Sequence, residues 1–247
     1  MAYLIHMGDC LDPETGLATL GDGAIDHVIT DPPYEAEAHT SARLVARGGG
    51  VLCEEPLDFA PITEEVRREA ALHFARVARR WSLMFCQAEA IALWRDAMQM
   101  GGASYRRSCV WIKPGAKPQY SGDRPGIGYE SIVVCHAPGR STWNGGGQLG
   151  VFTFTVPQHG RLHMTEKPLA LMETLVRLFT DPGDTIVDPF MGSGTTGVAA
   201  VHLGRNFIGW EKDPRYFRVA QRRLARVREQ LEIRAERPEP IQEELPL

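Results

Sequence analysis

Short runs of β-forming residues alternate along the chain with longer stretches in which apolar side chains recur every three or four positions. The short runs predict strands at residues 26–30, 82–86, 108–112, 131–135, 151–156, 185–188 and 206–210. The longer stretches predict helices at residues 63–80, 88–100, 168–179, 195–203 and 214–234. This alternation is typical of an α/β protein whose sheet is mostly parallel.

Three segments rich in glycine and proline interrupt the pattern, at residues 35–61, 113–128 and 136–150. The first contains the run Ala-Arg-Gly-Gly-Gly-Val, whose glycines favour a mobile loop. The end of the chain, residues 236–247, is acidic and contains prolines, which is typical of a disordered tail or a peptide ligand. We therefore expect one domain over residues 1–235, a mobile loop at about 35–61 and a disordered tail at 236–247.

The composition narrows the class of protein. With 247 residues, 43% of them hydrophobic, the chain is long enough for one domain with a substantial core. No run approaches the ~18 uncharged apolar residues of a membrane span, and the first residues do not resemble a signal peptide. The five cysteines are widely spaced without a Cys-x-x-Cys pair, so we expect neither a disulfide framework nor a metal site. An intracellular protein without membrane contact is the expectation.

The net charge of −4 is unevenly distributed. Residues 1–34 contain six acidic residues and no lysine or arginine, whereas residues 105–161 contain seven basic residues and two acidic ones. This division suggests a cationic ligand at one place and an anionic one at another. Ordinary surface variation is the alternative.

A glycine motif follows the expected strand at 185–188. Asp188 ends that strand, and Gly192, Gly194 and Gly197 follow with the spacing G-x-G-x-x-G before an expected helix. Glycines at this spacing let a ligand lie against a tight turn and a helix N-terminus. Glu211, at the end of the next expected strand, is placed to accept hydrogen bonds from ribose hydroxyls. The motif predicts a site for a dinucleotide or for an adenosine-containing cofactor.

The Asp188 carboxylate favours one of these ligands. It would repel the pyrophosphate of a nicotinamide dinucleotide, and it would attract the ammonium group of S-adenosylmethionine. We therefore predict S-adenosylmethionine as the cofactor. In the alternative, Asp188 only caps the turn before Pro189.

A second motif, Asp31-Pro32-Pro33-Tyr34, ends the expected strand at 26–30. The two prolines make this tip rigid and lack N–H groups. The Asp31 carboxylate and the Pro32 carbonyl are acceptors, and the Tyr34 ring is a stacking surface. A planar base with an exocyclic amino group offers the matching donors and flat face. A proline turn with a packed tyrosine is the structural alternative.

With both motifs present, the chain resembles the DNA amino-methyltransferases of the permuted β class, in which Asp-Pro-Pro-Tyr precedes the cofactor motif. The resemblance covers almost the whole chain. It implies a Rossmann-like, doubly wound methyltransferase sheet, mostly parallel with an antiparallel edge strand, and a circularly permuted motif order. It also implies that the two motif strands lie side by side.

The resemblance assigns roles to individual residues. The implied catalytic residues are Asp31, Pro32, Pro33 and Tyr34. The implied cofactor residues are Asp9, Cys10, Asp31, Thr165, Lys167, Asp188, Pro189, Phe190, Gly192, Ser193, Gly194, Thr195, Thr196 and Glu211. Among these, Asp9 meets the adenine of the cofactor, and Thr165 and Lys167 complete its methionine pocket. Trp111, Lys113 and Glu130 match the region that follows the catalytic helix.

The implied activity is methyl transfer from S-adenosylmethionine to adenine N6 in double-stranded DNA by base flipping, without a metal. Aspartate at the first position of the tetrapeptide is usual for adenine, whereas serine is more usual for cytosine N4, the nearest alternative. An NAD-dependent dehydrogenase would leave the tetrapeptide unexplained. A non-enzymatic nucleic-acid-binding module would not require the cofactor acids.

The same resemblance predicts a short target-recognition segment at about residues 136–161. The candidates for phosphate contacts are Arg106, Arg107, Lys113, Lys117, Arg124 and Arg140. Because the segment is short, the alternatives are a short recognition site, a contribution from residues 35–61, or a second subunit in a homodimer. The final Gln-Glu-Glu-Leu-Pro-Leu weakly resembles peptides that dock on bacterial sliding clamps. The cytoplasm of a bacterial or phage-infected cell is the expected location.

Overall fold

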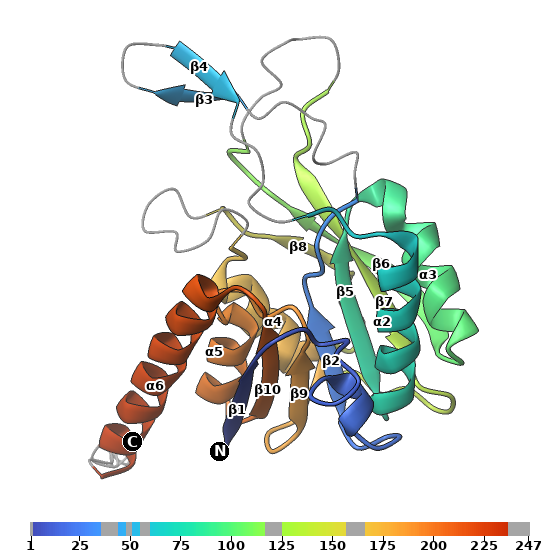
Figure 1. Cartoon of the computed structure of the whole chain (residues 1–247), viewed down its shortest axis with the longest axis vertical. Coiled ribbons are helices and arrows are strands. Elements are labelled where there is room, and N and C mark those ends of the chain that lie inside the picture. Colours follow the sequence, from blue (N-terminus) through green and yellow to red (C-terminus); the bar gives the residue numbers. More distant parts are fainter. Residues whose placement is uncertain are drawn as a thin grey trace, which may run out of the picture.

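The fold is an eight-stranded sheet between two layers of helices (Figure 1). A computed structural model describes residues 2–35, 44–47, 51–54, 60–116, 125–156 and 166–236. The strands of the sheet are β1 (Tyr3–Met7), β2 (His27–Thr30), β5 (Trp81–Cys86), β6 (Ser104–Ile112), β7 (Tyr129–His136), β8 (Val151–Thr153), β9 (Thr185–Asp188) and β10 (Asn206–Glu211). Their order across the sheet is β1-β10-β9-β2-β5-β7-β6-β8.

The expectation of a mostly parallel sheet is confirmed, with one difference in the place of the antiparallel strand. Strand β7 lies inside the sheet, antiparallel to both β5 and β6. Strand β8 then pairs in parallel with β6 and forms the edge. Strands β2 and β9, which carry the two motifs, pair in parallel. Their carboxyl ends therefore meet at the same edge, where open α/β sheets bind ligands.

Helices cover both faces of the sheet (Figure 1). One face is covered by α2 (Glu64–Val77) and α3 (Ile91–Met100), and the other by α4 (Leu169–Phe179), α5 (Thr195–His202) and α6 (Pro214–Glu236). Successive side chains of a strand point to opposite faces. In β2, Val28 accordingly packs in the core under α2 and α3, and Ile29 packs in the core under α4 and α5. Because both side chains are fully buried, β2 is fixed from both sides just before its tip.

The sequence pattern misses two elements. Strand β1 is an edge strand that leaves Leu4 and Met7 exposed, so its apolar alternation is weak. The segment 35–61 was expected to be a loop, but it contains an antiparallel hairpin of β3 (Leu44–Arg47) and β4 (Val51–Glu54). Two β-forming runs separated by three glycines are typical of a hairpin, so the loop prediction is wrong for these strands. The expected tail lies outside the described residues from 237 on.

Within the described ranges, no helix is both long and apolar enough to cross a membrane.

A buried ionic network joins β2 to β9 at the end of the sheet opposite the motif tips. His27 Nε2 lies 2.8 Å from Asp184 Oδ2, and Asp184 Oδ2 also accepts a 2.8 Å hydrogen bond from Arg80. Burial lowers the pKa of His27 to about 4. The histidine is therefore neutral in the folded protein at neutral pH.

We expect His27 to make the stability depend on pH. Because its pKa is about 6.5 in an unfolded chain, the unfolded state binds more protons, and stability falls as pH decreases from about 6.5 to 4. His27→Gln cannot titrate. The free energy of unfolding of the wild type should therefore fall by about 2 kcal/mol more than that of His27→Gln between pH 7 and pH 5. Urea denaturation at the two pH values measures this difference, and equal losses in both proteins would contradict it.

Candidate active site

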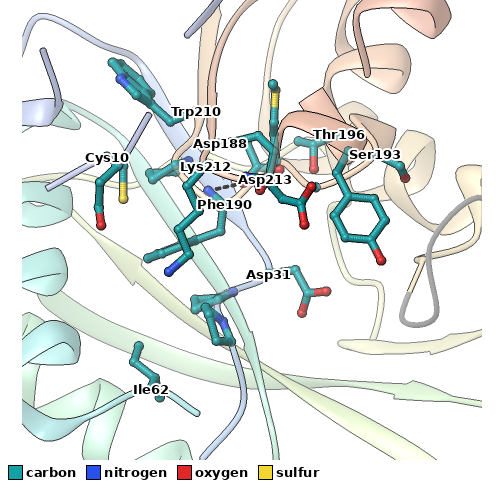
Figure 2. Close-up of a pocket in the computed structure, with 18 of the residues that line it drawn as sticks. Cys10, Asp31, Ile62, Asp188, Phe190, Ser193, Thr196, Trp210, Lys212 and Asp213 are labelled. Atoms are coloured by element: carbon teal, nitrogen blue, oxygen red, sulfur yellow. Dashed lines mark hydrogen bonds between the residues drawn. The ribbon is translucent and has the colours of Figure 1, made fainter. Parts of the chain in front are cut away.

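The carboxyl ends of neighbouring parallel strands border a cavity of about 690 Å³ (Figure 2). Four acidic residues lie at these strand ends: Asp9 follows β1, Asp31 follows β2, Asp188 ends β9 and Glu211 ends β10. This volume is typical of small-molecule sites, which span about 300–1,000 Å³. The two sequence motifs thus contribute to a single cavity.

Most of the residues selected from the sequence line this cavity. They are Asp9, Cys10, Asp31, Pro32, Pro33, Tyr34, Lys167, Asp188, Pro189, Phe190, Gly192, Ser193, Thr195, Thr196 and Glu211. Thr165 lies outside the described residues. The sequence analysis missed Ile62, Lys212 and Tyr216, which also line the cavity. Lys212 and Tyr216 belong to the segment whose resemblance marked Glu211, but only Glu211 was assigned a role there, and no motif marks Ile62. No group of three or more potential metal ligands occurs in the described part of the chain.

The glycines of the motif shape the cavity wall at α5. Gly192 and Gly194 have φ values of 51° and 81°, in the left-handed region that favours glycine. Gly194 is the N-cap of α5 and packs against α6. A Cβ added to it would lie 2.9 Å from Cβ of Ala220 on α6. At Gly197, an added Cβ would lie 2.6 Å from the ring of Phe207 on β10. Larger residues would therefore push α5 away from the sheet and from α6.

Arg223 on α6 binds the loop that carries the glycine motif. The sequence analysis did not single out this arginine. Its guanidinium donates to the carbonyl and the hydroxyl of Ser193, both at 2.9 Å, and to Thr195 Oγ1 at 3.1 Å. It also forms a 2.8 Å ion pair with Glu166. Arg223 therefore fixes the serine and threonine side chains that face the cavity.

Asp188 joins the two motif strands. It is 2% exposed and accepts hydrogen bonds from Thr30 Oγ1 at 2.7 Å and from the Phe190 N–H at 3.2 Å. Burial outweighs these bonds and raises the pKa of Asp188 to about 7. A cation bound in the cavity would favour the ionised carboxylate, so this residue suits a positively charged ligand.

The other acidic strand ends differ in environment. Glu211 accepts a 2.7 Å hydrogen bond from the Asp213 N–H, and burial raises its pKa. Asp9 accepts a 3.0 Å bond from the Leu11 N–H and is exposed. Burial raises the pKa of the adjacent Cys10 thiol far above its usual value, so Cys10 contributes a neutral surface.

Asp31 has one hydrogen-bonded oxygen and one unpaired oxygen. Its Oδ2 accepts a 2.5 Å hydrogen bond from Lys167, whereas its buried Oδ1 has no hydrogen-bond partner among the described residues. Burial raises the pKa of Asp31 to about 6, and the Lys167 charge opposes that rise. The tip therefore holds a carboxylate oxygen that an incoming N–H donor can satisfy.

Tyr34 and Lys167 meet beside Asp31. Tyr34 is 7% exposed, and its hydroxyl accepts a 3.0 Å hydrogen bond from Lys167. Lys167 was expected in the methionine pocket of the cofactor, but its ammonium group points at the tetrapeptide. This placement changes the role that we assign to Lys167.

The basic residues proposed for phosphate contacts that lie in the described ranges do not form one surface. Lys113 is engaged in a 2.9 Å ion pair with Glu130 and is mostly buried. Arg106 donates to the Gly139 carbonyl near the end of β7, which pairs with the start of β5, away from the cavity. Arg107 and Arg140 belong to the same end of the sheet, so we do not propose phosphate contacts for these four residues. Lys117 and Arg124 lie outside the described residues.

The fold also places part of the expected target-recognition segment, residues 136–161, away from the cavity. The Asn144 N–H donates to the Leu178 carbonyl, and the Asn144 side chain donates to the Thr180 carbonyl. Residues around 144 therefore pack at the end of the sheet opposite the cavity. Only the part from β8 onward returns toward the cavity, and residues 157–161 lie outside the described ranges.

Comparisons of sequence place the chain among methylases. A family model described as DNA methylase matches residues 137–222. YubD of Escherichia coli (strain K12), a protein assigned as a methylase, is 30% identical over 223 residues, which cover 89% of this chain and 89% of YubD. Matches to three type II methyltransferases cover between 28% and 47% of the lengths of those proteins.

Solved structures agree in fold. The M1.HpyAVI–SAM complex matches with a TM-score of 0.67 and 25% identity, over 90% of this chain and 98% of that one. The cytosine-N4-specific PvuII DNA methyltransferase matches with a TM-score of 0.68 and 16% identity, over 93% of this chain and 91% of the other. The expected methyltransferase-type sheet is thereby confirmed, while the permuted motif order stays a prediction.

Proposed function

This chain belongs to the DNA methylase family of N6-adenine and N4-cytosine methyltransferases, and from that membership we propose that it methylates adenine N6 in double-stranded DNA. The methyl donor is S-adenosylmethionine. The observation that carries the proposal is that Asp31, whose buried Oδ1 has no hydrogen-bond partner among the described residues, and the glycine motif line the same cavity. Family membership argues against the dehydrogenase and the non-enzymatic module.

The residues of the cavity fit S-adenosylmethionine. We propose that Asp188 holds its ammonium group and that Glu211 accepts hydrogen bonds from its ribose hydroxyls. Asp9 and Cys10 line the part of the cavity near β1, where we place the adenine. The glycine loop, fixed by Arg223, lets the amino-acid portion lie close to the backbone. The sulfonium of this cofactor supplies an electrophilic methyl group.

The tetrapeptide supplies the groups that act on the base. A target adenine must leave the duplex to reach the cavity, and we propose that it stacks on Tyr34. Asp31 Oδ1 and the Pro32 carbonyl then accept hydrogen bonds from the two N6 hydrogens. As the N6–methyl bond forms and the methyl–sulfur bond breaks, positive charge would develop on N6 and be stabilised by the Asp31 carboxylate, and the surplus N6 proton would then leave through that carboxylate to water. Correct alignment of the amine and the methyl group supplies much of the remaining rate enhancement.

Adenine is proposed over cytosine because the first residue of the tetrapeptide is aspartate. The resemblance associates serine at this position with cytosine N4. The structural neighbours do not discriminate, since PvuII is cytosine-specific.

DNA isolated from cells that express the chain should contain N6-methyladenine in one short sequence context. Mass spectrometry of the hydrolysed DNA identifies the base, and methylation-sensitive sequencing identifies the context. DNA from cells that express Asp31→Ala is the control and should lack the modification. N4-methylcytosine in place of N6-methyladenine would establish the alternative, and unmodified DNA would refute both.

The segment between β6 and β7 is our proposal for contacts with the DNA backbone. It begins at the cavity end of the sheet, where the Lys113 N–H bonds to the Gly128 carbonyl at 2.8 Å. Lys117 and Arg124 fall within it and are the remaining candidates for phosphates. Neither a homodimer nor docking on a sliding clamp gains support from the described residues.

A further inference from the structure

A string of four alternating charges extends from the tetrapeptide to the base of the β6–β7 hairpin. Asp31 Oδ2 lies 2.5 Å from Lys167 Nζ, which lies 3.1 Å from Glu130 Oε2. Glu130 Oε1 in turn lies 2.9 Å from Lys113 Nζ. Exposed fractions of the four side chains are 23%, 5%, 13% and 15%, in the order Asp31, Lys167, Glu130, Lys113. The string is largely shielded from water.

The Lys167 ammonium group is enclosed on its remaining sides by aromatic rings. Its Nζ lies 5.0 Å from the ring centroid of Phe85, 5.4 Å from that of Tyr34 and 6.0 Å from that of Trp111. An ammonium group has three N–H donors, and Lys167 faces three oxygens, from Asp31, Tyr34 and Glu130. Both of the Lys167 hydrogen bonds are made to the tetrapeptide, to Asp31 and to Tyr34.

We propose that Lys167, held in place by Glu130, is a positioning residue that fixes the orientation in which the unpaired oxygen of Asp31 accepts a hydrogen bond from the target amine. This inference rests on the proposed methyltransferase function. The ammonium group binds Oδ2 and thereby fixes the rotation of the carboxylate. Glu130 prevents Lys167 from following Asp31 when a base enters, because Glu130 is itself anchored on β7 by Lys113.

Stability alone does not account for the string. Buried ion pairs contribute little net stability because desolvation offsets their attraction. A structural network would also be expected to satisfy both oxygens of each carboxylate, yet Asp31 Oδ1 and Glu130 Oε2 are both left without a hydrogen-bond partner among the described residues. Of the residues in the string, Asp31 is the one that both carries such an oxygen and lines the proposed substrate cavity.

The same groups set the charge of Asp31. Burial raises its pKa, Lys167 and the more distant Lys113 lower it, and Glu130 raises it. Tyr34, Cys86 and Asp188 are the other titratable groups nearby. Burial alone would lower the pKa of Lys167, but the two carboxylates hold it well above its usual value, so the ammonium group stays charged.

The experiment measures single-turnover methylation of duplex DNA against pH for the wild type, Lys167→Met and Glu130→Gln. Lys167→Met should reduce the plateau rate by about 100-fold, the loss expected when a group that contacts the substrate is misplaced by about 1 Å, and move the acid limb of the rate–pH profile to higher pH. Glu130→Gln should reduce the plateau less and move the limb to lower pH, because a negative charge facing Asp31 is removed. The matched control, Glu229→Gln on the exposed side of α6, should change neither.

Calorimetric titration with S-adenosylmethionine separates this role from cofactor binding. Affinity should change by less than about threefold in both variants, and Lys167→Arg should restore part of the rate. An unshifted acid limb together with weakened cofactor binding would overturn the inference. If Lys167→Met fails to fold, the shift in Glu130→Gln decides the question. A wild-type protein that does not methylate DNA would refute the proposed function itself.

Discussion

Replacing Asp31 with alanine should lower the rate of methyl transfer by about 100- to 1,000-fold or more, the loss expected when a charged group no longer stabilises the transition state. Asp31 Oδ1 is the unpaired carboxylate oxygen at the tip of β2, and the Pro32 carbonyl, the other acceptor that we assign to the amine, carries no full charge. The interaction strengthens only as positive charge develops on the amine. The turnover number and its ratio to KM should therefore fall together.

The folded structure should survive this substitution. Asp31→Ala removes a carboxylate that burial already disfavours, and Lys167 keeps its ion pair with Glu130. The affinity for S-adenosylmethionine should change only a few fold, since Asp188 and Glu211 remain.

Rapid-quench assays with radiolabelled cofactor, together with calorimetric titration, measure both effects. Asp96→Ala is the matched control, because Asp96 is an exposed carboxylate on α3 that pairs with Arg95. A rate for Asp31→Ala within tenfold of the wild type would remove Asp31 from the proposed reaction.

Strands bounded by strong local signals can be predicted from the sequence. Strand β9 has the expected limits, Thr185–Asp188, because a glycine-containing turn precedes it and Pro189 follows it. Strand β1 and the hairpin of β3 and β4 were missed for different reasons. An edge strand needs no regular burial, and three glycines are compatible with both a hairpin turn and a loop.

The candidate site is partly predictable for a similar reason. Each motif marks the end of one strand, and parallel pairing then places the tips of β2 and β9 together. Lys167 shows the limit of this reasoning. It lies 136 positions from Asp31, and no local pattern reports that their side chains meet. The charge counts along the chain were also misleading about where DNA would bind. The basic residues counted in 105–161 include Arg106, which lies where β6 begins and β7 ends, at the end of the sheet opposite the cavity.

The affinity for S-adenosylmethionine should depend on pH through Asp188. The pKa of Asp188 is about 7 because the carboxyl is buried, so about half of the molecules carry a neutral Asp188 at that pH. The ammonium group of the cofactor binds the ionised form, and binding must therefore release a proton at lower pH. With this pKa, affinity should rise by roughly eightfold between pH 6 and pH 7.5. It should fall again above about pH 8, where an α-amino group loses its proton.

Asp188→Asn should abolish the rise in affinity between pH 6 and pH 7.5, which is the acid limb of the affinity–pH curve. It should also weaken binding by about 10- to 100-fold at pH 7.5, the loss expected for a hydrogen bond to a charged group. Calorimetry in buffers with different ionisation enthalpies measures both the affinity and the released proton. Asp31→Ala and Glu211→Gln serve as controls, because both carboxyls also have raised pKa values in the same cavity. If either control loses the limb while Asp188→Asn keeps it, the titrating group is not Asp188. Retention of the limb only when Asp188 is present would identify the carboxylate at the end of β9 as the partner of the cofactor's ammonium group.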